Sequence, residues 1–183
     1  MFKNPVVREI LDWALHIVFA IVVGLLIVNY VAQITIVHGS SMEPTLQDGN
    51  ILMIEKITPR FGSLHRGDII TLNVPEDVGE AKKTIIKRVV GLGGDTVEIK
   101  GGKVYVNGSE LKEDYINGNT TLSENPQYDK VTVPKGQVFV LGDNRLPYAS
   151  MDGRTIGPKD IKKVGGRAIF RILPLNKMGL LKK

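Results

Sequence analysis

The strongest pattern in the chain is an apolar run over residues 13–32, in which only His16 and Asn29 are strongly polar. A helix over this run is roughly 30 Å long, which is enough to cross the hydrocarbon layer of a bilayer. The run is longer than the apolar segment of a typical cleaved leader, and the bulky Tyr30 stands where cleavage after Ala32 would require a small residue. The pattern therefore predicts an uncleaved transmembrane anchor.

Positive charges flank this run on one side only. Lys3 and Arg8 precede it, whereas residues 29–55 contain no Lys or Arg. Positively charged flanks remain on the cytoplasmic side of a membrane. We therefore expect a single-pass protein of the cell membrane, with residues 1–35 forming the cytoplasmic N-terminus and the anchor, and residues 36–183 forming an extracytoplasmic domain.

Beyond the anchor, apolar positions come in short runs bounded by Gly, Pro and Asp, which is typical of strands. The runs expected as strands are residues 51–54, 68–74, 84–90 and 137–141. Gly101 and Gly102 fit the two-residue turn of a β-hairpin over residues 97–106. In that register Ile99 faces Val104, so one face of the hairpin should be buried and the other solvated.

Two further segments complete the predicted fold. Residues 107–132 carry several Asn, Gly and Pro and no sustained hydrophobic period, which predicts a small polar excursion from the domain. Residues 158–163 offer a short helical turn. We therefore expect a mainly β fold, with antiparallel sheets curled into a barrel-like domain, preceded by one N-terminal transmembrane helix.

Composition narrows the class of protein. The 183 residues have room for one domain and an appendage, and the absence of cysteine excludes disulfides and thiolate chemistry. The net charge of +5 is spread along the chain. This distribution suits a surface near anionic lipid and gives no indication of nucleic-acid binding. Three scattered histidines without cysteine do not make a plausible metal site, so we expect no metal and no cofactor.

The first candidate for chemistry is Ser41, in the segment that follows the anchor. Pro44 fixes its own φ and pushes Glu43 toward extended geometry, so a helix cannot easily continue here and Ser41 should lie on an exposed or half-exposed loop. Even a fully extended chain from Ala32 places Ser41 within about 30 Å of the membrane surface. Any chemistry at this serine is therefore close to the membrane.

The second candidate is Lys87, within the expected strand 84–90. Side chains alternate along a strand, so Lys87 shares a face with Ile85 and Val89, whereas Arg88 points to the other face. Burial lowers the pKa of a lysine by up to about 3–5 units, while arginine stays charged. Lys87 is therefore the candidate general base. The alternative is that its ammonium group reaches water along the sheet.

A third group of polar residues follows the strand 137–141. Asp143, Arg145, Asp152 and Arg154 lie in a loop rich in turn-forming residues. Taken alone, they could pair as ordinary surface charges, which contribute little to stability.

Together and in this order, the segments resemble the boxes of bacterial type I signal peptidases, in particular the short Gram-positive branch. The matching segments are residues 41–46, 66–69, 87–91 with 94–95, and 142–145 followed by Ser150, Asp152 and Arg154. The anchor precedes them in the expected position, and the resemblance covers nearly the whole chain.

The resemblance implies a membrane-bound serine endopeptidase that cleaves N-terminal signal peptides from exported preproteins after small residues. Ser41 would be the nucleophile, with its backbone N–H in the oxyanion hole, and Lys87 the neutral general base. Ser150 would hold the lysine amine in place. The implied partners are preproteins and membrane lipid, with no nucleic acid and no metal.

The resemblance also assigns supporting and substrate-binding residues. It implies one pair between Asp143 and Arg88 and another between Asp152 and Arg154, both shaping the catalytic loop. The small substrate residues would fit shallow pockets beside the strand after the anchor and the strand that carries Lys87. The residues expected in these pockets are Met42 and Ile85.

The chain departs from the family pattern at three points. Gly93 stands where proline is usual, which should loosen that turn. Four residues separate Arg145 from Ser150 where the family usually has two, and Gly153 replaces a usual serine. The longer spacing changes the path of the loop that would carry Ser150.

Two alternatives remain open from the sequence. His38 lies three residues before Ser41 and could serve as the base, because a neutral imidazole needs no burial to act near pH 7. A domain without activity could instead bind exported chains if Lys87 is protonated, and this alternative predicts that Ser41→Ala leaves function intact.

Overall fold

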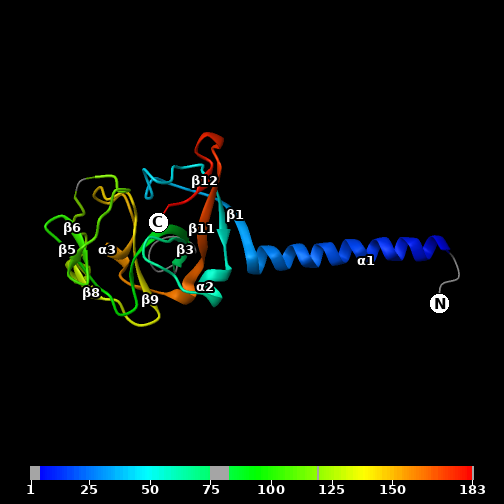
Figure 1. Ribbon diagram of the computed structural model, residues 1–183, viewed down its shortest axis with the longest axis horizontal. Coiled ribbons are helices and arrows are strands. Elements are labelled where there is room, and N and C mark those ends of the chain that lie inside the picture. Colours follow the sequence, from blue (N-terminus) through cyan, green and yellow to red (C-terminus); the bar gives the residue numbers. More distant parts are fainter. Residues whose placement is uncertain (1–4, 75–82, 119, 183) are drawn as a thin grey trace.

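The computed structural model describes residues 5–74, 83–118 and 120–182, and it shows a long N-terminal helix that ends in a β-rich domain (Figure 1). Helix α1 spans Pro5–Leu26 and continues into a π-helical turn, η1, over Ile27–Val31. The stretch Glu9–Val31 is long and apolar enough to cross a membrane, and its apolar window is not buried within the protein. The predicted anchor is therefore present as a helix. Lys3 lies outside the described residues.

The remainder of the described chain forms two antiparallel sheets. The larger sheet contains β1 (Ala32–Ile36), β2 (Ile51–Glu55), β3 (Ile69–Val74), β4 (Lys83–Leu92), β9 (Gln137–Leu141), β10 (Lys159–Asp160), β11 (Val164–Leu173) and β12 (Gly179–Leu180). The smaller sheet contains β5 (Thr96–Lys100), β6 (Lys103–Val106), β7 (Ser109–Glu110) and β8 (Lys130–Thr132). Short helical segments are α2 (Ile57–Phe61), η3 (Pro126–Tyr128), α3 (Gly153–Ile156), η4 (Ile161–Lys163) and η5 (Leu175–Lys177).

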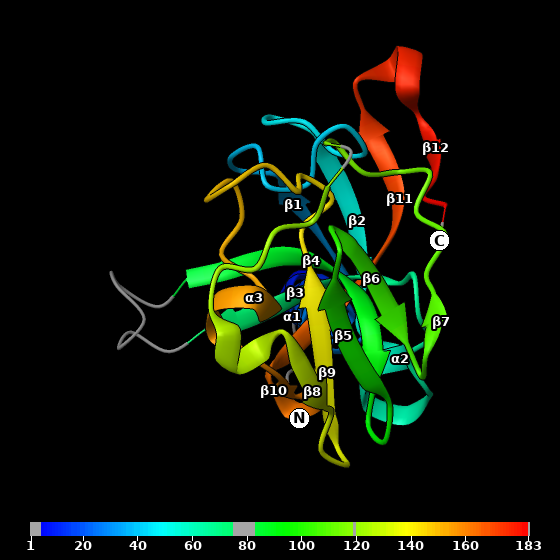
Figure 2. The same cartoon turned by 90° about the vertical axis from the view of Figure 1, so that its left-hand side faces the viewer.

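The predicted mainly β, antiparallel class is confirmed. The larger sheet has the order β1-β2-β11-β3-β4-β9-β10, with β12 beside β11, and the smaller has the order β7-β6-β5-β8. Viewed from the end away from the anchor, β5 and β6 lie in front of the larger sheet, close to β9 (Figure 2). Within the described ranges β1 and β10 remain sheet edges, so the barrel-like curl does not close into a barrel.

The four strands expected from the sequence are confirmed as β2, β3, β4 and β9. The hairpin is also confirmed, because Ile99 pairs with Val104 and Val97 with Val106, and these four side chains are buried on one face. The predicted turn at residues 158–163 contains η4. The excursion at residues 107–132 contributes β7, η3 and β8 rather than remaining without regular structure.

Strands β10, β11 and β12 lie where no strand was expected, and β1, the strand implied after the anchor, begins earlier than expected. The helical prediction extended to Ala32, but Ala32 already pairs with Glu55, so the boundary expected at residue 35 falls inside β1. Strand β11 was missed because two glycines interrupt its apolar pattern. Gly166 is needed there, since a Cβ at this position would come within 2.7 Å of the Glu55 carbonyl oxygen on β2.

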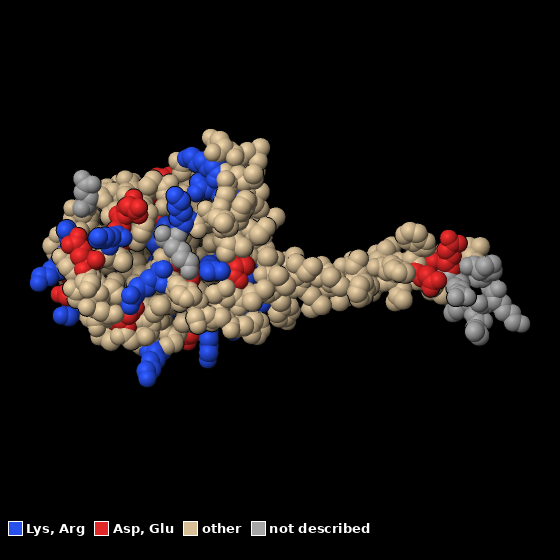
Figure 3. Space-filling view, in the orientation of Figure 1, with Lys and Arg blue, Asp and Glu red and all other residues tan. Residues whose placement is uncertain are grey.

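Two cations fasten the end of the anchor to the β domain. Lys56 Nζ donates a hydrogen bond of 3.0 Å to the Val28 carbonyl, and Arg60 Nη1 on α2 donates one of 2.9 Å to the Asn29 carbonyl. The Arg60 guanidinium also lies 5.1 Å from the centre of the Tyr30 ring. The last carbonyl groups of a helix lack partners within it, and cations there also complement the helix dipole. Figure 3 shows the uncharged shaft of the helix and the cations spread over the domain.

Strands β4 and β9 are buried on both faces because they are shared by two apolar clusters. The first cluster includes Ile70, Leu72, Ile85, Val89, Val138 and Val140. The second includes Val90, Val97, Val104, Phe139 and Leu141. Consequently Lys87 and Arg88 are both buried although they point to opposite faces of β4. The alternation along the strand predicted that one of these two cations would lie on an apolar face. In the structure both of them do.

Candidate active site

Ser41 lies in a series of turns between β1 and β2. Met42 and Leu46 anchor these turns by packing into a third apolar cluster, and the Leu46 N–H donates to the Met42 carbonyl at 2.8 Å. Ser41 itself is half-buried. The predicted half-exposed loop is therefore confirmed, with the backbone on either side of the serine held in place.

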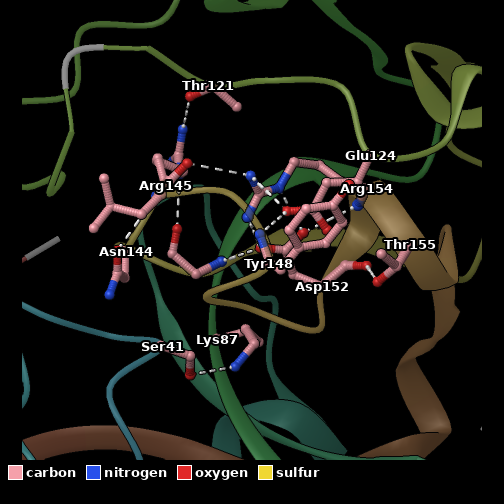
Figure 4. Close-up of polar contacts among 12 residues, drawn as sticks. Ser41, Lys87, Thr121, Glu124, Asn144, Arg145, Tyr148, Asp152, Arg154 and Thr155 are labelled. Atoms are coloured by element: carbon pink, nitrogen blue, oxygen red, sulfur yellow. Dashed lines mark hydrogen bonds and ion pairs between the residues drawn. The ribbon is translucent and has the colours of Figure 1, made fainter.

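Lys87 reaches Ser41 from β4. The Lys87 Nζ and Ser41 Oγ atoms lie 2.7 Å apart, and Nζ also donates to the Ile86 carbonyl at 2.9 Å (Figure 4). Lys87 is only 3% exposed, so the alternative in which its ammonium group extends into water is wrong. His38 is exposed on the same groove, and within the described part of the chain Ser41 Oγ is hydrogen-bonded to Lys87 and not to His38.

The neighbouring Arg88 forms the first expected ion pair. Its Nε and Nη2 atoms donate to the two carboxylate oxygens of Asp143 at 2.8 and 2.7 Å, and both side chains are at most 1% exposed. The guanidinium carbon lies 3.9 Å from the centre of the Tyr115 ring. Burial acts to lower the pKa of Arg88, but the hydrogen bonds and charge of Asp143 hold this pKa above its ordinary value. The pair joins β4 to the loop after β9.

The second expected pair joins Asp152 and Arg154, and both side chains are fully buried. Arg154 Nε and Nη2 each donate to an Asp152 carboxylate oxygen at 3.0 Å. Burial acts to lower the pKa of Arg154, but the hydrogen bonds and charge of Asp152 keep it raised. The structure thus brings together both pairs that the resemblance implied.

Ser150 is buried, and its Oγ has no hydrogen-bond partner among the described residues. It packs against Gly142, because a Cβ on Gly142 would come within 2.2 Å of Ser150 Oγ and 2.5 Å of the Ser41 carbonyl oxygen. The additional residues before Ser150 project outward, since Tyr148 is 88% exposed with φ of 57°. The longer loop therefore still returns Ser150 to the vicinity of Ser41, while its implied contact with the lysine amine stays a prediction.

A groove with a volume of about 750 Å³ runs past Ser41 and Lys87. One wall is β1 together with the Ser41 turns, and the other is the part of β4 before Lys87. Met42 and Ile85, the residues expected in the substrate pockets, both line it. Because β1 is a sheet edge, its outer backbone groups can pair with an extended peptide.

The sequence missed the contribution of residues 107–132. Glu113 pairs with Arg145 and Glu124 with Arg154, so the polar excursion supplies buried partners to the segment after β9. The signal that could have revealed them is a surplus of arginine. Buried guanidinium groups require carboxylates, and Arg145 had no partner within its own loop.

A serine hydroxyl bonded to a buried lysine beside an extended groove is an arrangement suited to the chemistry of a serine hydrolase. Residues 10–173 match the model of the family described as signal peptidase, peptidase S26. The chain therefore belongs to the signal peptidase family, peptidase S26, and its enzyme class is that of a serine endopeptidase. The resemblance that the motifs indicated is confirmed.

Two Bacillus relatives agree with this membership. Signal peptidase I P of Bacillus subtilis subsp. natto is 37% identical over 97% of this chain and 98% of its own length. Signal peptidase I T of Bacillus subtilis is 38% identical over 92% of this chain and 88% of its own length. A solved signal peptidase I from Enterococcus faecalis is 32% identical, covering 57% of this chain and 96% of that one, with a TM-score of 0.46.

Proposed function

We propose that this chain removes N-terminal signal peptides from exported preproteins by a Ser41–Lys87 mechanism. The observation that carries the proposal is the 2.7 Å contact between Ser41 Oγ and Lys87 Nζ, made by a lysine that is almost fully buried. Burial disfavours the charged form of a lysine, and only a neutral amine can accept the hydroxyl proton.

The reaction follows from this geometry. Ser41 Oγ attacks the carbonyl carbon of the scissile bond while Lys87 Nζ takes its proton, and the Ser41 backbone N–H stabilises the resulting oxyanion. The lysine then gives the proton to the departing amine, which leaves the signal peptide esterified to Ser41. A water molecule, deprotonated by the same lysine, hydrolyses the ester and restores the serine hydroxyl. Ser150 would hold the lysine amine during these proton transfers.

The substrate would lie extended along the groove. Its backbone would pair with the free edge of β1, as in other cases of strand addition, and its small side chains would enter the shallow pockets beside Met42 and Ile85. Such pockets exclude bulky side chains by steric clash, so one enzyme can accept many unrelated preproteins that share small residues before the cleaved bond.

The membrane completes the proposed arrangement. With α1 spanning the bilayer once and the N-terminus in the cytoplasm, the catalytic domain stands on the outer side, where exported preproteins emerge. Lys56 and Arg60, at the outer end of the helix, are suited to the region of the lipid headgroups.

The test is cleavage of a purified preprotein in detergent micelles by the wild type and by Ser41→Ala. We expect a mature product from the wild type and none from Ser41→Ala, with binding of the uncleaved preprotein retained. Equal processing by the two proteins would contradict serine chemistry. Binding without cleavage by the wild type would support the domain that only binds exported chains.

A further inference from the structure

The backbone of Gly142 is held from both directions beside the nucleophile. Its N–H donates to Asp152 Oδ2 at 2.9 Å, and its carbonyl accepts a hydrogen bond of 2.7 Å from Arg145 Nε. The same residue packs against the Ser41 carbonyl oxygen and the Ser150 hydroxyl, so closely that a Cβ would clash with both. The position of Gly142 therefore determines the space available to Ser41 and Ser150.

Glu113 holds the arginine that donates to the Gly142 carbonyl. Arg145, which is fully buried, donates to both carboxylate oxygens of Glu113 and to Thr121 Oγ1 at 2.8 Å. Glu113 and Thr121 both come from the excursion. Without the charge of Glu113, the buried guanidinium would lack a carboxylate partner and would reorient toward water.

Glu113 also supports the strand that carries Lys87. The Tyr115 hydroxyl donates to Glu113 Oε1 at 2.9 Å, and the Tyr115 ring lies against the guanidinium of Arg88. One carboxylate thus binds Arg145 in the catalytic loop directly and reaches Arg88, next to Lys87, through Tyr115.

Glu124 pairs with the arginine that fixes Asp152, the acceptor for the Gly142 N–H. Arg154 Nη1 lies 3.1 Å from Glu124 Oε1, while the rest of the Arg154 guanidinium fixes Asp152, the acceptor for Gly142. Glu124 is nearly as buried as its partners, with 4% of its side chain exposed. Burial raises the pKa of the Glu124 carboxyl, and the charge of Arg154 opposes this rise.

We propose that Glu113 and Glu124 are positioning residues of the peptidase reaction: through Arg145 and Arg154 they fix the two sides of Gly142 against the nucleophile. This inference rests on the proposed function. It assigns the excursion a role in catalysis without contact with substrate. Displacement of a reacting group by about 1 Å is enough to lower a rate by about 100-fold, so such distant support can be essential.

The experiment compares steady-state cleavage by Glu113→Gln and Glu124→Gln with that by Glu110→Gln. Glu110 is the matched control because it belongs to the same segment but pairs with Lys103 in an exposed ion pair. We expect kcat to fall by about 10- to 100-fold in the two buried variants, with KM within about twofold of the wild type, and no change in the control. We also expect Glu124→Gln to alter the acidic limb of the kcat profile, since its side chain cannot ionise.

Thermal unfolding of each variant separates positioning from global stability. If a Gln variant fails to fold, Glu113→Asp and Glu124→Asp carry the test, because they retain the charge but shorten its reach. Folded variants with reduced kcat support the proposal. A kcat at the wild-type level, or a loss only in proportion to the unfolded fraction, overturns it. Ser41→Ala in the same assay keeps the proposed function separate, since it must be inactive whatever the glutamates do.

Discussion

Arg88 and Asp143 form a two-point ion pair from which water is almost completely excluded, and it ties the strand of Lys87 to the loop of Gly142. Removal of one member would leave the other charge buried without compensation. We expect Asp143→Asn to lower the free energy of unfolding by about 3–5 kcal/mol, as measured by denaturant titration.

The control for this prediction is Glu98→Gln. Glu98 pairs with Lys130 in an exposed contact of 3.7 Å, so its removal should cost less than about 1 kcal/mol. Equal losses in the two variants would show that burial of the Arg88–Asp143 pair is not what makes it important.

Acid should weaken the turn that follows β4. Two hydrogen bonds between Leu92 and Asp95 close this turn, and the loosening expected from Gly93 stays a prediction. Hydrogen bonds from Arg66 lower the pKa of Asp95 to about 2. In the unfolded chain an aspartate carboxyl has a pKa near about 4. A carboxylate whose pKa is lower in the folded protein stabilises the fold at pH values above about 4. This stabilisation is lost as the pH falls from about 4 to about 2.

Denaturant titration at pH 6 and pH 2 tests this prediction. Because Arg66 is partly exposed, we expect Asp95→Asn to be about 1–2 kcal/mol less stable than the wild type at pH 6, with the difference largely gone at pH 2. An undiminished difference at pH 2 would show that ionisation of Asp95 is not responsible.

Gly142 should tolerate no side chain. In Gly142→Ala the new Cβ must displace the Ser41 backbone or the Ser150 hydroxyl, so we expect kcat to fall by about 100-fold. A Cβ at Gly24 in the anchor would meet no described atom within 4 Å apart from the adjoining backbone of its own helix, so Gly24→Ala should retain wild-type cleavage. Retained activity in Gly142→Ala would mean that the loop can shift without disturbing the nucleophile.

The end of the anchor should loosen when its two cations are removed. We expect faster amide hydrogen exchange at Ile27–Val31 in the double variant Lys56→Gln/Arg60→Gln, measured in lipid nanodiscs, because the last carbonyl groups of the helix lose these partners. The exposed Lys103→Gln serves as the control. Unchanged exchange would indicate that other contacts hold the junction.

Much of this architecture can be predicted from local pattern. The apolar run, the alternating strands and the Gly101–Gly102 hairpin follow from periodicities of 3.6 and 2, and the position of Lys87 follows from the alternation along one strand. Strand β11 could not be found this way, since Gly166 is selected by contact with β2, which lies more than a hundred residues earlier in the chain.

The candidate site likewise contains residues that the sequence indicates and residues that only the fold reveals. Ser41 and Lys87 could be singled out as candidates from their local sequence, and the two ion pairs were implied by the resemblance to the family, which rests on short continuous motifs. Glu113 and Glu124 were not, since a buried carboxylate in a polar segment has the same local sequence as an exposed one. Only the fold shows that the excursion lies against the catalytic loop.

The most direct test of the Ser41–Lys87 mechanism is the single-turnover rate of preprotein cleavage near neutral pH in Lys87→Ala and His38→Ala. We expect Lys87→Ala to lose about 100- to 10,000-fold in rate, whereas His38→Ala should stay within about threefold of the wild type. Cleavage that survives in Lys87→Ala but is lost in His38→Ala would contradict the role of Lys87 as the general base.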